Sequence, residues 1–484
     1  MGLFLDKPKK EKTTESGEGN GLRFAVSAMQ GWRVDMEDSH SMKTNLAPNL
    51  QGSSYFAVFD GHAGDFVSKY AAEHLWEEIL NNLVNLEVKR SDSGNSEIRE
   101  ESDVNAGKSN VKSTASTKPE NGSSKTHDTN EAEETGSDSI NKTIEKEEST
   151  ESEEKVRNNG SDCLSKDLIH FKASIRKGFL DIDEKLQELP RFVSGDERSG
   201  STAIAVIVTN THILFANCGD SRAVLSRSGG IVAFATLDHK PYNVDEKTRI
   251  ERAGGSVIIQ RVNGSLAVSR ALGDFDYKRV PNLPCTEQLV SAEPELTCIE
   301  RSPDDEFLVL ACDGIWDVMS NQEVVDYVRY RLKIHQNLTQ MTGELLETCL
   351  AKGSKDNMSV IIVTFPGAPE VSQEAVEADA KIDSLLKEKI EGYIKKSSDP
   401  KEIDTSVIVD FLQDQELSDL PPGGGLHAKM DTIESILDEL IPDRTRDEAS
   451  HLGSSIPVPL NMIRQFATDG VIDDDAMPSG EADE

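Results

Sequence analysis

Positive charge, aromatic side chains and long apolar runs are all scarce in this 484-residue chain. Lys and Arg together number 52 against 87 Asp and Glu, so the formal net charge is −35 at pH 7. Such a charge disfavours nucleic acid and anionic lipid surfaces and favours basic partners. It also repels phosphorylated ligands at long range, so binding one requires metal ions or arginine close by. The length suits one large domain with extensions.

Closely spaced cysteine pairs are absent, because no Cys-x-x-Cys motif occurs. This absence removes support for a zinc or thiol-redox motif of that kind. Cysteines inside apolar runs are typical of small core residues, and a reduced intracellular compartment fits them best. The six cysteines are Cys163, Cys218, Cys285, Cys298, Cys312 and Cys349.

Stretches long enough to span a bilayer are absent too, and residues 1–14 contain no hydrophobic signal-peptide core. We therefore expect a cytoplasmic protein, with a nuclear location left open. Gly2 begins a pattern that resembles a myristoylation site, although Asp6 stands where Ser or Thr is preferred. An acyl chain beside the lysines that follow would give reversible membrane contact. The alternative, which the motif alone favours, is a flexible and unmodified N-terminus.

Aromatic side chains disappear between Trp76 and Phe171. Within this stretch, residues 87–160 are rich in Ser, Thr, Glu, Asn and Lys and hold 18 acidic and 11 basic residues. So few apolar side chains cannot offset the entropy cost of ordering the backbone, and we predict a disordered acidic insert. The insert interrupts one domain, because motifs with chemical potential lie on both sides of it.

Strand and helix patterns follow the insert. Residues 165–189 repeat apolar side chains at helical spacing, and Pro190 ends this pattern. Further strands are predicted at 202–208, 212–216, 223–225, 306–311 and 359–365, and further helices at 245–253, 321–334 and 338–351. Strands dominate and helices flank them, so we predict sheets packed together with helices outside.

The composition changes after Pro366, where charged helical segments replace strands. Helices are predicted at 372–396, 405–417 and 430–440, with a break at 421–425. No internal repeat is visible. The predicted organisation is an N-terminal segment (1–21), a main domain (22–365) interrupted by the insert (87–160), a helical extension (366–445) and an acidic disordered tail (446–484).

Acidic residues stand where predicted strands end, in four segments far apart in the chain. The segments are Arg33–Asp38, Phe56–His62, Phe307–Gly314 and Lys355–Val360. Hard divalent ions prefer carboxylate and carbonyl oxygens gathered from several segments at the rim of a rigid scaffold. Strand-end carboxylates with one Arg and one His therefore favour a metal-assisted site that cleaves phosphate esters.

The metal-binding residues of such a site can be named from their chemistry. Asp60 is suited to bridge two ions, and Gly61 allows its own carbonyl to approach one of them. Asp313 and Asp356 can complete the shell of one ion together with water. Taken singly, an Asp-Gly pair after a strand is ordinarily a turn. The convergence of all four segments favours the metal site.

The remaining polar residues of these segments suit phosphate chemistry. Arg33 can hold two phosphate oxygens in a fork, and His62 can protonate the departing Ser or Thr oxygen. Glu37 and Asp38 can hold metal-bound waters or orient His62. Taken alone, Arg33 is more typical of a surface ion pair and His62 of a structural histidine.

Seven motifs, in this order, give the chain a family resemblance. They are Met29–Asp38, Phe56–Gly64, Ser199–Ala203, Ala216–Arg222, Leu266–Asp274, Ala311–Asp317 and Gly353–Ser359. From about Leu22 to Phe365, outside the insert, the chain resembles the metal-dependent protein phosphatases of type 2C. The first residues and Leu420–Gly425 further resemble the animal alpha/beta branch, whose members share the N-terminal pattern, and this supports acylation of Gly2. That branch does not usually carry a long acidic insert.

The resemblance implies an α+β fold with a central antiparallel β-sandwich flanked by helices (α-β-β-α). It implies hydrolysis of phosphoserine and phosphothreonine in proteins by a metal-bridging hydroxide, without a phosphoenzyme. The cofactors would be two Mg²⁺ or Mn²⁺ ions, with a weaker third. We expect a monomeric signalling enzyme that acts on phosphorylated proteins and binds no nucleic acid.

The resemblance also assigns residues by motif match. Asp60, the Gly61 carbonyl, Asp313 and Asp356 match the ligands of the two ions. Asp220 and Asp317 match positions linked to the third ion, which shares Asp313. Arg33 matches the phosphate clamp and His62 the general acid, and residues 238 to about 294 include the flap that helps choose substrates.

Four alternatives can be compared with this interpretation. A cysteine-based phosphatase needs Arg six positions after Cys, and no cysteine here has it. An aspartyl-phosphate enzyme needs Asp-x-Asp-x-Thr, and Asp274–Lys278 lacks the Thr. A catalytically weak scaffold that binds phosphoproteins through the acidic insert conflicts with the intact ligand set. An interaction role of the insert is compatible with catalysis.

Overall fold

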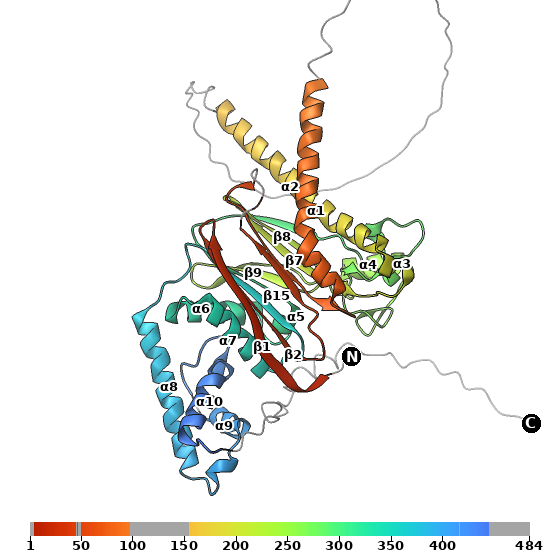
Figure 1. Cartoon of the computed structure of the whole chain (residues 1–484). Helices are drawn as coiled ribbons and strands as arrows, with labels where there is room; N and C mark the ends of the chain where they lie inside the picture. Colours follow the sequence, from red (N-terminus) through yellow and green to blue (C-terminus); the bar gives the residue numbers. More distant parts are fainter. Residues whose placement is uncertain (1–3, 45, 47–49, 97–153, 416, 445–484) are drawn as a thin grey trace, which may run out of the picture. The chain divides into compact units, whose positions relative to one another are not determined.

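The structure is a computed structural model (Figure 1). It describes residues 4–44, 46, 50–96, 154–415 and 417–444. The chain divides into two compact units, residues 1–82 with 172–484, and residues 83–171. The described part of the second unit consists of the end of helix α1 (Phe66–Ser96) and the start of helix α2 (Glu154–Glu188). The strands described below and the candidate site belong to the first unit.

Two antiparallel sheets form the centre of this unit. The six-stranded sheet has the order β1 (Phe4–Gly19), β2 (Leu22–Arg33), β16 (Met358–Thr364), β15 (Asp305–Ala311), β9 (Arg222–Arg227) and β10 (Ile231–Ala235). The five-stranded sheet has the order β14 (Glu295–Glu300), β8 (His212–Cys218), β7 (Ala203–Val208), β4 (Ser54–Phe59) and β3 (Ser39–Lys43). Neighbouring strands in both sheets are antiparallel, as expected.

Apolar side chains of both sheets meet in one core. Alternate residues of β2 face opposite ways, because side chains alternate along a strand. Phe24 and Val26 join the core shared by the two sheets, whereas Ala25 and Met29 join the cluster formed with the helices. Phe56 of β4 contacts Phe24 edge-on, with ring centroids 5.1 Å apart. The two sheets therefore pack face to face as a sandwich.

Helices cover the outer faces of the sandwich. Helices α6 (Asn321–Ile334) and α7 (Leu338–Ala351) share an apolar cluster with the six-stranded sheet. A capping box at Ser320 precedes α6, whose bounds agree with the helix predicted at 321–334. On the five-stranded sheet, Tyr55 packs on Trp76 of α1 with ring centroids 5.1 Å apart. The α-β-β-α class is confirmed.

Two short sheets and several short helices connect these layers. One sheet has the order β13 (Leu272–Gly273), β6 (Gly200–Ser201) and β5 (Gly61–His62), and the other pairs β11 (Val257–Ile258) with β12 (Arg261–Val262). The short helices are α3 (Pro190–Ser194), α4 (Val244–Arg252), α5 (Asp313–Trp316), η2 (Phe275–Tyr277) and η3 (Cys285–Glu287). Residues 238–294, the predicted flap, contain α4 and the β11–β12 hairpin.

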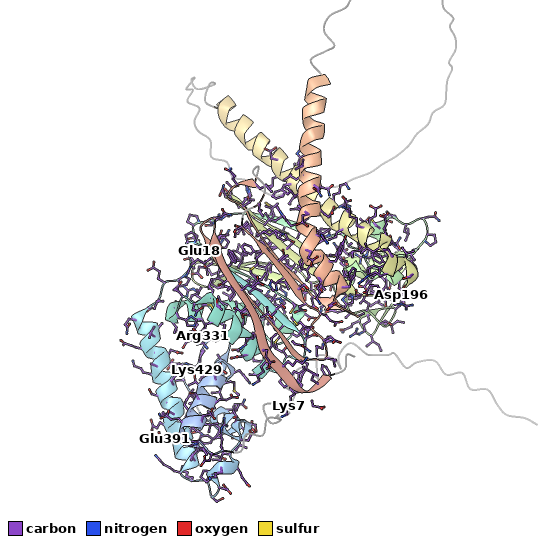
Figure 2. The ribbon with its side chains drawn as sticks, viewed as in Figure 1. Lys7, Glu18, Asp196, Arg331, Glu391 and Lys429 are labelled. Carbon is purple, nitrogen blue, oxygen red and sulfur yellow. The ribbon has the colours of Figure 1, made fainter. Side chains whose placement is uncertain are left out.

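A helical extension follows β16 and has its own apolar core. It consists of α8 (Gln373–Ile394), η4 (Pro400–Glu402), α9 (Thr405–Gln413), η5 (Gly425–Lys429) and α10 (Met430–Leu440). Lys429, labelled in Figure 2, is buried and donates to Asp379 at 2.6 Å and Asp383 at 2.7 Å. Arg331 of α6 donates to the carbonyl oxygen of Ala428 at 3.0 Å. Buried charge therefore ties the extension together and to the sandwich.

Two predicted segment boundaries need correction. The N-terminal segment is not separate from the domain, because Phe4–Gly19 forms strand β1 and pairs with β2. The ends of the predicted insert are helical, since α1 continues to Ser96 and α2 begins at Glu154. The rest of the insert, the tail 446–484 and Gly2 lie outside the described residues.

Candidate active site

Asp60 and Gly61 lie where β4 leaves its sheet and β5 begins. The carbonyl oxygen of Asp60 accepts a hydrogen bond from the backbone N–H of Thr202 at 2.9 Å, which holds the turn in place. A Cβ on Gly61 would lie 2.3 Å from the carbonyl oxygen of Glu37. Only glycine therefore lets the segment containing Asp60 meet the segment containing Glu37.

Asp313 and Asp356 come together through a second close backbone contact. Asp313 begins α5 directly after β15, and β15 pairs with β16, which follows Asp356. A Cβ on Gly314 would lie 2.1 Å from the carbonyl oxygen of Asn357. Adjacent strand ends thus carry both carboxylates to the same rim, as the sequence pattern predicted.

Asn357 joins two of these segments and was not singled out from the sequence. Its side-chain amide donates to the carbonyl oxygens of Gln30 at 2.8 Å and Asp35 at 3.0 Å. Its side-chain oxygen accepts the backbone N–H of Glu37 at 2.9 Å. The side chain is buried, and these three bonds use both its amide nitrogen and its oxygen, so they fix the position of residues 33–38 beside Asp356.

The carboxylates at this rim repel one another. Burial and the neighbouring charge of Asp313 raise the pKa of Asp60 well above its ordinary value. Burial and the charge of Asp220 do the same to the pKa of Asp313. Burial raises the pKa of Asp38 to about 7. Such a group of acids is poorly stable without positive charge between its members.

The residues present fit divalent cations. Neither carboxylate oxygen of Asp38 has a hydrogen-bond partner among the described residues, although both are buried. Ligand atoms of Asp38, Asp60 and Cys312 lie within 4.8 Å of one another. Burial raises the pKa of the Cys312 thiol well above its ordinary value, so the thiol stays protonated and is a poor ligand for a hard cation. The carboxylate oxygens are the suitable donors.

Arg33 ends β2 and points to the same rim. Its Nη2 donates to Oδ2 of Asp356 at 2.7 Å, and both side chains remain 30% exposed. Although burial opposes the shift, this bond and the charge of Asp356 raise the pKa of Arg33. Glu37 is used differently, because its carboxylate accepts the backbone N–H of Gly64 at 2.6 Å. Glu37 thereby holds the turn that follows His62.

His62 has a carboxylate partner that sequence reasoning missed. Its Nε2 lies 2.7 Å from Oδ2 of Asp274, which is almost completely buried. Burial opposes protonation of His62, but the charge of Asp274 outweighs it and raises the pKa of His62. A Cβ on Gly200 would lie 2.3 Å from Asp274 Oδ2 and 2.4 Å from His62 Nε2. The motif containing Asp274 was recognised, but its partner is 212 positions away.

Asp220 and Asp317 adjoin Asp313 on the flap side of the site. Burial and Asp220 raise the pKa of Asp313, while the backbone N–H of Asp317 donates to the Asp313 carbonyl at 2.8 Å. Asp220 has a cationic partner, because Lys240 Nζ lies 2.5 Å from its Oδ2. Every predicted metal or phosphate residue between Arg33 and Asp356 therefore lies in one connected group.

Comparison with known proteins identifies the family that the chain resembles. The sequence matches Protein phosphatase 2C over residues 22–128 and 109–358, and the Protein serine/threonine phosphatase 2C C-terminal domain over residues 359–438.

The chain belongs to the protein phosphatase 2C family.

Two relatives show how far the likeness of this phosphatase extends. Protein phosphatase 1A of Homo sapiens is 44% identical over 451 residues, which are 93% of this chain and 98% of that protein. Protein phosphatase 1B of Mus musculus is 43% identical over 447 residues, 92% of this chain and 97% of that protein. A phosphatase of Toxoplasma gondii shares the fold, with a TM-score of 0.50 at 23% identity over 75% of this chain and 98% of its own.

The chain is therefore a metal-dependent protein serine/threonine phosphatase, and its family depends on Mg²⁺ or Mn²⁺. Its substrates are phosphorylated proteins. The scaffold alternative is not favoured. No helix in the described part of the chain is long and apolar enough to cross a membrane.

Proposed function

We propose that two divalent ions bind among Asp60, the Gly61 carbonyl, Asp313 and Asp356, with Asp60 shared between them. The raised pKa values of Asp60 and Asp313 support this, since two bound cations would remove the repulsion behind those shifts. When bound, such ions make a water molecule acidic and withdraw charge from phosphoryl oxygens. A third and weaker ion would use Asp220 and Asp317 together with Asp313.

Arg33 is proposed to hold the substrate phosphate. Its guanidinium has five donors, and Asp356 takes one of them at 2.7 Å. The exposed remainder can bind two phosphate oxygens in a fork and stabilise the charge that develops on them during attack. Asp356 would therefore act twice, as a metal ligand and as the group that orients Arg33.

His62 is proposed to donate a proton to the departing Ser or Thr oxygen. The contact with Asp274 supports this role, because a carboxylate beside Nε2 favours the protonated ring. Protonated His62 keeps its other ring nitrogen as a donor for the leaving oxygen. Glu37 and Asp38 support the chemistry indirectly, Glu37 by fixing the turn at Gly64 and Asp38 by holding water or a metal ion.

The proposal assigns catalysis to residues 22–365 outside the insert 87–160. The extension 366–445 and the tail 446–484 stand outside the chemistry. We further propose that the enzyme is a monomer that acts in cytoplasmic signalling, with a nuclear location open. Acylation of Gly2 would add reversible membrane contact through the N-terminal strand.

The observation that carries the proposal is the group of carboxylates at one rim, with Asp38 buried and Asp60 and Asp313 partly buried, whose pKa values are raised. The test is hydrolysis of a phosphothreonine peptide with Mg²⁺ or Mn²⁺, with and without EDTA, beside the Asp313→Asn variant. Phosphate release should require the metal and fall by at least about a thousandfold in the variant. Release that continued in EDTA, or in folded Asp313→Asn protein, would overturn the residue assignment.

A further inference from the structure

Lys240 stands among the carboxylates assigned to the third ion. Its Nζ lies 2.5 Å from Oδ2 of Asp220, which is 4% exposed at its side chain. Asp313 and Asp238 are further sources of negative charge around the amine, and although burial opposes the shift, these charges with Asp220 raise the pKa of Lys240. The amine also acts on Asp317, where its charge opposes the pKa rise that burial causes.

The backbone that carries Lys240 is fixed beside the backbone that carries Asp220. The N–H of His239 donates to the carbonyl oxygen of Gly219 at 2.9 Å, and the N–H of Gly219 donates to Nδ1 of His239 at 3.1 Å. His239 is buried, and its other ring nitrogen lies 3.3 Å from Glu295. Because the two chain segments are tied at adjacent residues, only the flexible lysine side chain can leave Asp220.

We propose that Lys240 is a tethered cation that competes with the third divalent ion for Asp220. The amine neutralises Asp220 when the third site is empty, and the ion binds only after the amine has moved away. This inference rests on the third-ion assignment in the proposed function and adds to it a reason for weak binding. Lys240 thereby raises the concentration of divalent ion that is needed to fill the third site.

The competition predicts a specific change in metal affinity. Replacing Lys240 by Met keeps the length and removes the charge, so Asp220 becomes an uncompensated ligand. A unit charge within hydrogen-bond distance of a partly buried carboxylate changes ion affinity by about tenfold or more. Lys240→Met should therefore lower the dissociation constant of the weakest Mn²⁺ site by about tenfold, whereas Lys240→Arg should keep it within a few-fold of the parent.

The first experiment measures Mn²⁺ binding to the full chain at pH 7. Binding is detected by the electron paramagnetic resonance signal of the free ion and by calorimetry. Asp220→Asn should remove the weak site in every background and leave the tight sites in place. Lys352→Met is the matched control, because Lys352 pairs at 2.8 Å with Glu323, which is not a proposed metal ligand, and should leave every site unchanged. An unchanged or weakened third site in folded Lys240→Met would overturn the proposal.

A second readout needs no variant. The partly buried, ion-paired amine of Lys240 should resist a lysine-specific acylating reagent in metal-free protein and react several-fold faster once Mn²⁺ fills the weak site. Lys352 should react equally at both metal concentrations. Filling of the weak site without any change at Lys240 would reject the competition, although the two-ion assignment would stand. A chain that bound no Mn²⁺ at all would instead reject the proposed function.

Discussion

Two groups of wholly or partly buried carboxylates in this chain have opposite electrostatics. Glu246 of α4 accepts hydrogen bonds from Arg270 at 2.7 Å, Arg249 at 2.7 Å and the Ser269 hydroxyl at 2.6 Å. Although burial opposes the shift, these partners lower the pKa of Glu246 to about 2. At the active-site rim, burial and neighbouring acids raise the pKa of Asp60 and related residues instead.

The difference separates a structural role from a functional one. The group around Glu246 is complete, because two arginines and a hydroxyl satisfy its carboxylate within the protein. At the rim, Arg33 and Lys240 pair with Asp356 and Asp220, but the pKa values of Asp60 and Asp313 remain raised. Repulsion among these acids therefore opposes folding, and bound cations would relieve it. Removing a carboxylate from the rim should therefore lower activity and keep or raise metal-free stability. Removing an arginine from the group around Glu246 should lower stability.

Removing Asp60 should have the largest effect on activity. Asp60→Asn deletes the proposed shared ligand, so turnover of a phosphothreonine peptide should fall by at least about a thousandfold at saturating Mn²⁺. Without metal, the variant should unfold at the same or a higher urea concentration than the parent, since one repelling charge is gone. Loss of both activity and metal-free stability would mean that Asp60, like Glu246, has a structural role.

Removing Arg270 should have the largest effect on stability. Arg270→Met leaves Glu246 buried with one arginine, which costs about 3–5 kcal/mol of unfolding free energy. The measurement is the urea midpoint at pH 7, with an unchanged slope required for the comparison. Lys185→Met is a suitable control, because it breaks an exposed pair with Glu78 and should cost less than about 1 kcal/mol. Equal costs for the two variants would contradict the assignment.

The two regions should also respond oppositely to pH in metal-free protein. Asp38 has a pKa of about 7 when folded, so its protonated form stabilises the fold fully below about pH 4, and this contribution is lost as the pH rises towards 7. Glu246, with a pKa of about 2, stabilises above about pH 4.5 and loses that contribution only as the pH falls towards 2. The unfolding free energy in EDTA should therefore decrease from pH 5 to pH 7.5.

The controls for this prediction are a variant and a cation. Asp38→Asn should flatten the decrease, and saturating Mg²⁺ should abolish it by favouring the ionised carboxylates. A metal-free unfolding free energy that increased over this interval, and did not respond to Asp38→Asn, would contradict the electrostatic account of the rim.

Short contiguous patterns made much of the fold and site predictable. The bounds of α6, α7 and α10 agree with their predicted ranges, because apolar periodicity and end signals lie within each segment. Carboxylates at strand ends were likewise visible, since each follows a local apolar run. The predicted roles of these residues remain predictions until variants are measured.

Features that depend on distant partners were not predictable. Strand β1 has the composition of a solvated tail, and backbone pairing with β2 incorporates it into the sheet. The links from His62 to Asp274 and from Lys240 to Asp220 join segments that only the folded sheet order brings together. The lengths of α1 and α2 within the insert were missed because their polar sequence carries no end signal.

The smallest predicted effect concerns Asp274, which shares one property with each of the two groups of carboxylates. Its carboxylate is buried like that of Glu246, yet its partner His62 is the proposed proton donor of the reaction. Asp274 has φ of 52°, a backbone conformation that Asn tolerates, so Asp274→Asn should fold normally. The variant removes the charge that favours protonated His62, and turnover of a phosphothreonine peptide should fall by about ten- to a hundredfold.

An aryl phosphate distinguishes the two possible reasons for such a loss. Its leaving group needs little protonation, so Asp274→Asn should slow its hydrolysis by only a few-fold if Asp274 acts through His62. His62→Gln should show the same selectivity for the alkyl substrate, and the double variant should be no slower than His62→Gln alone. Equal slowing of both substrates by Asp274→Asn would place Asp274 with Glu246, as a buried acid whose function is to hold the fold.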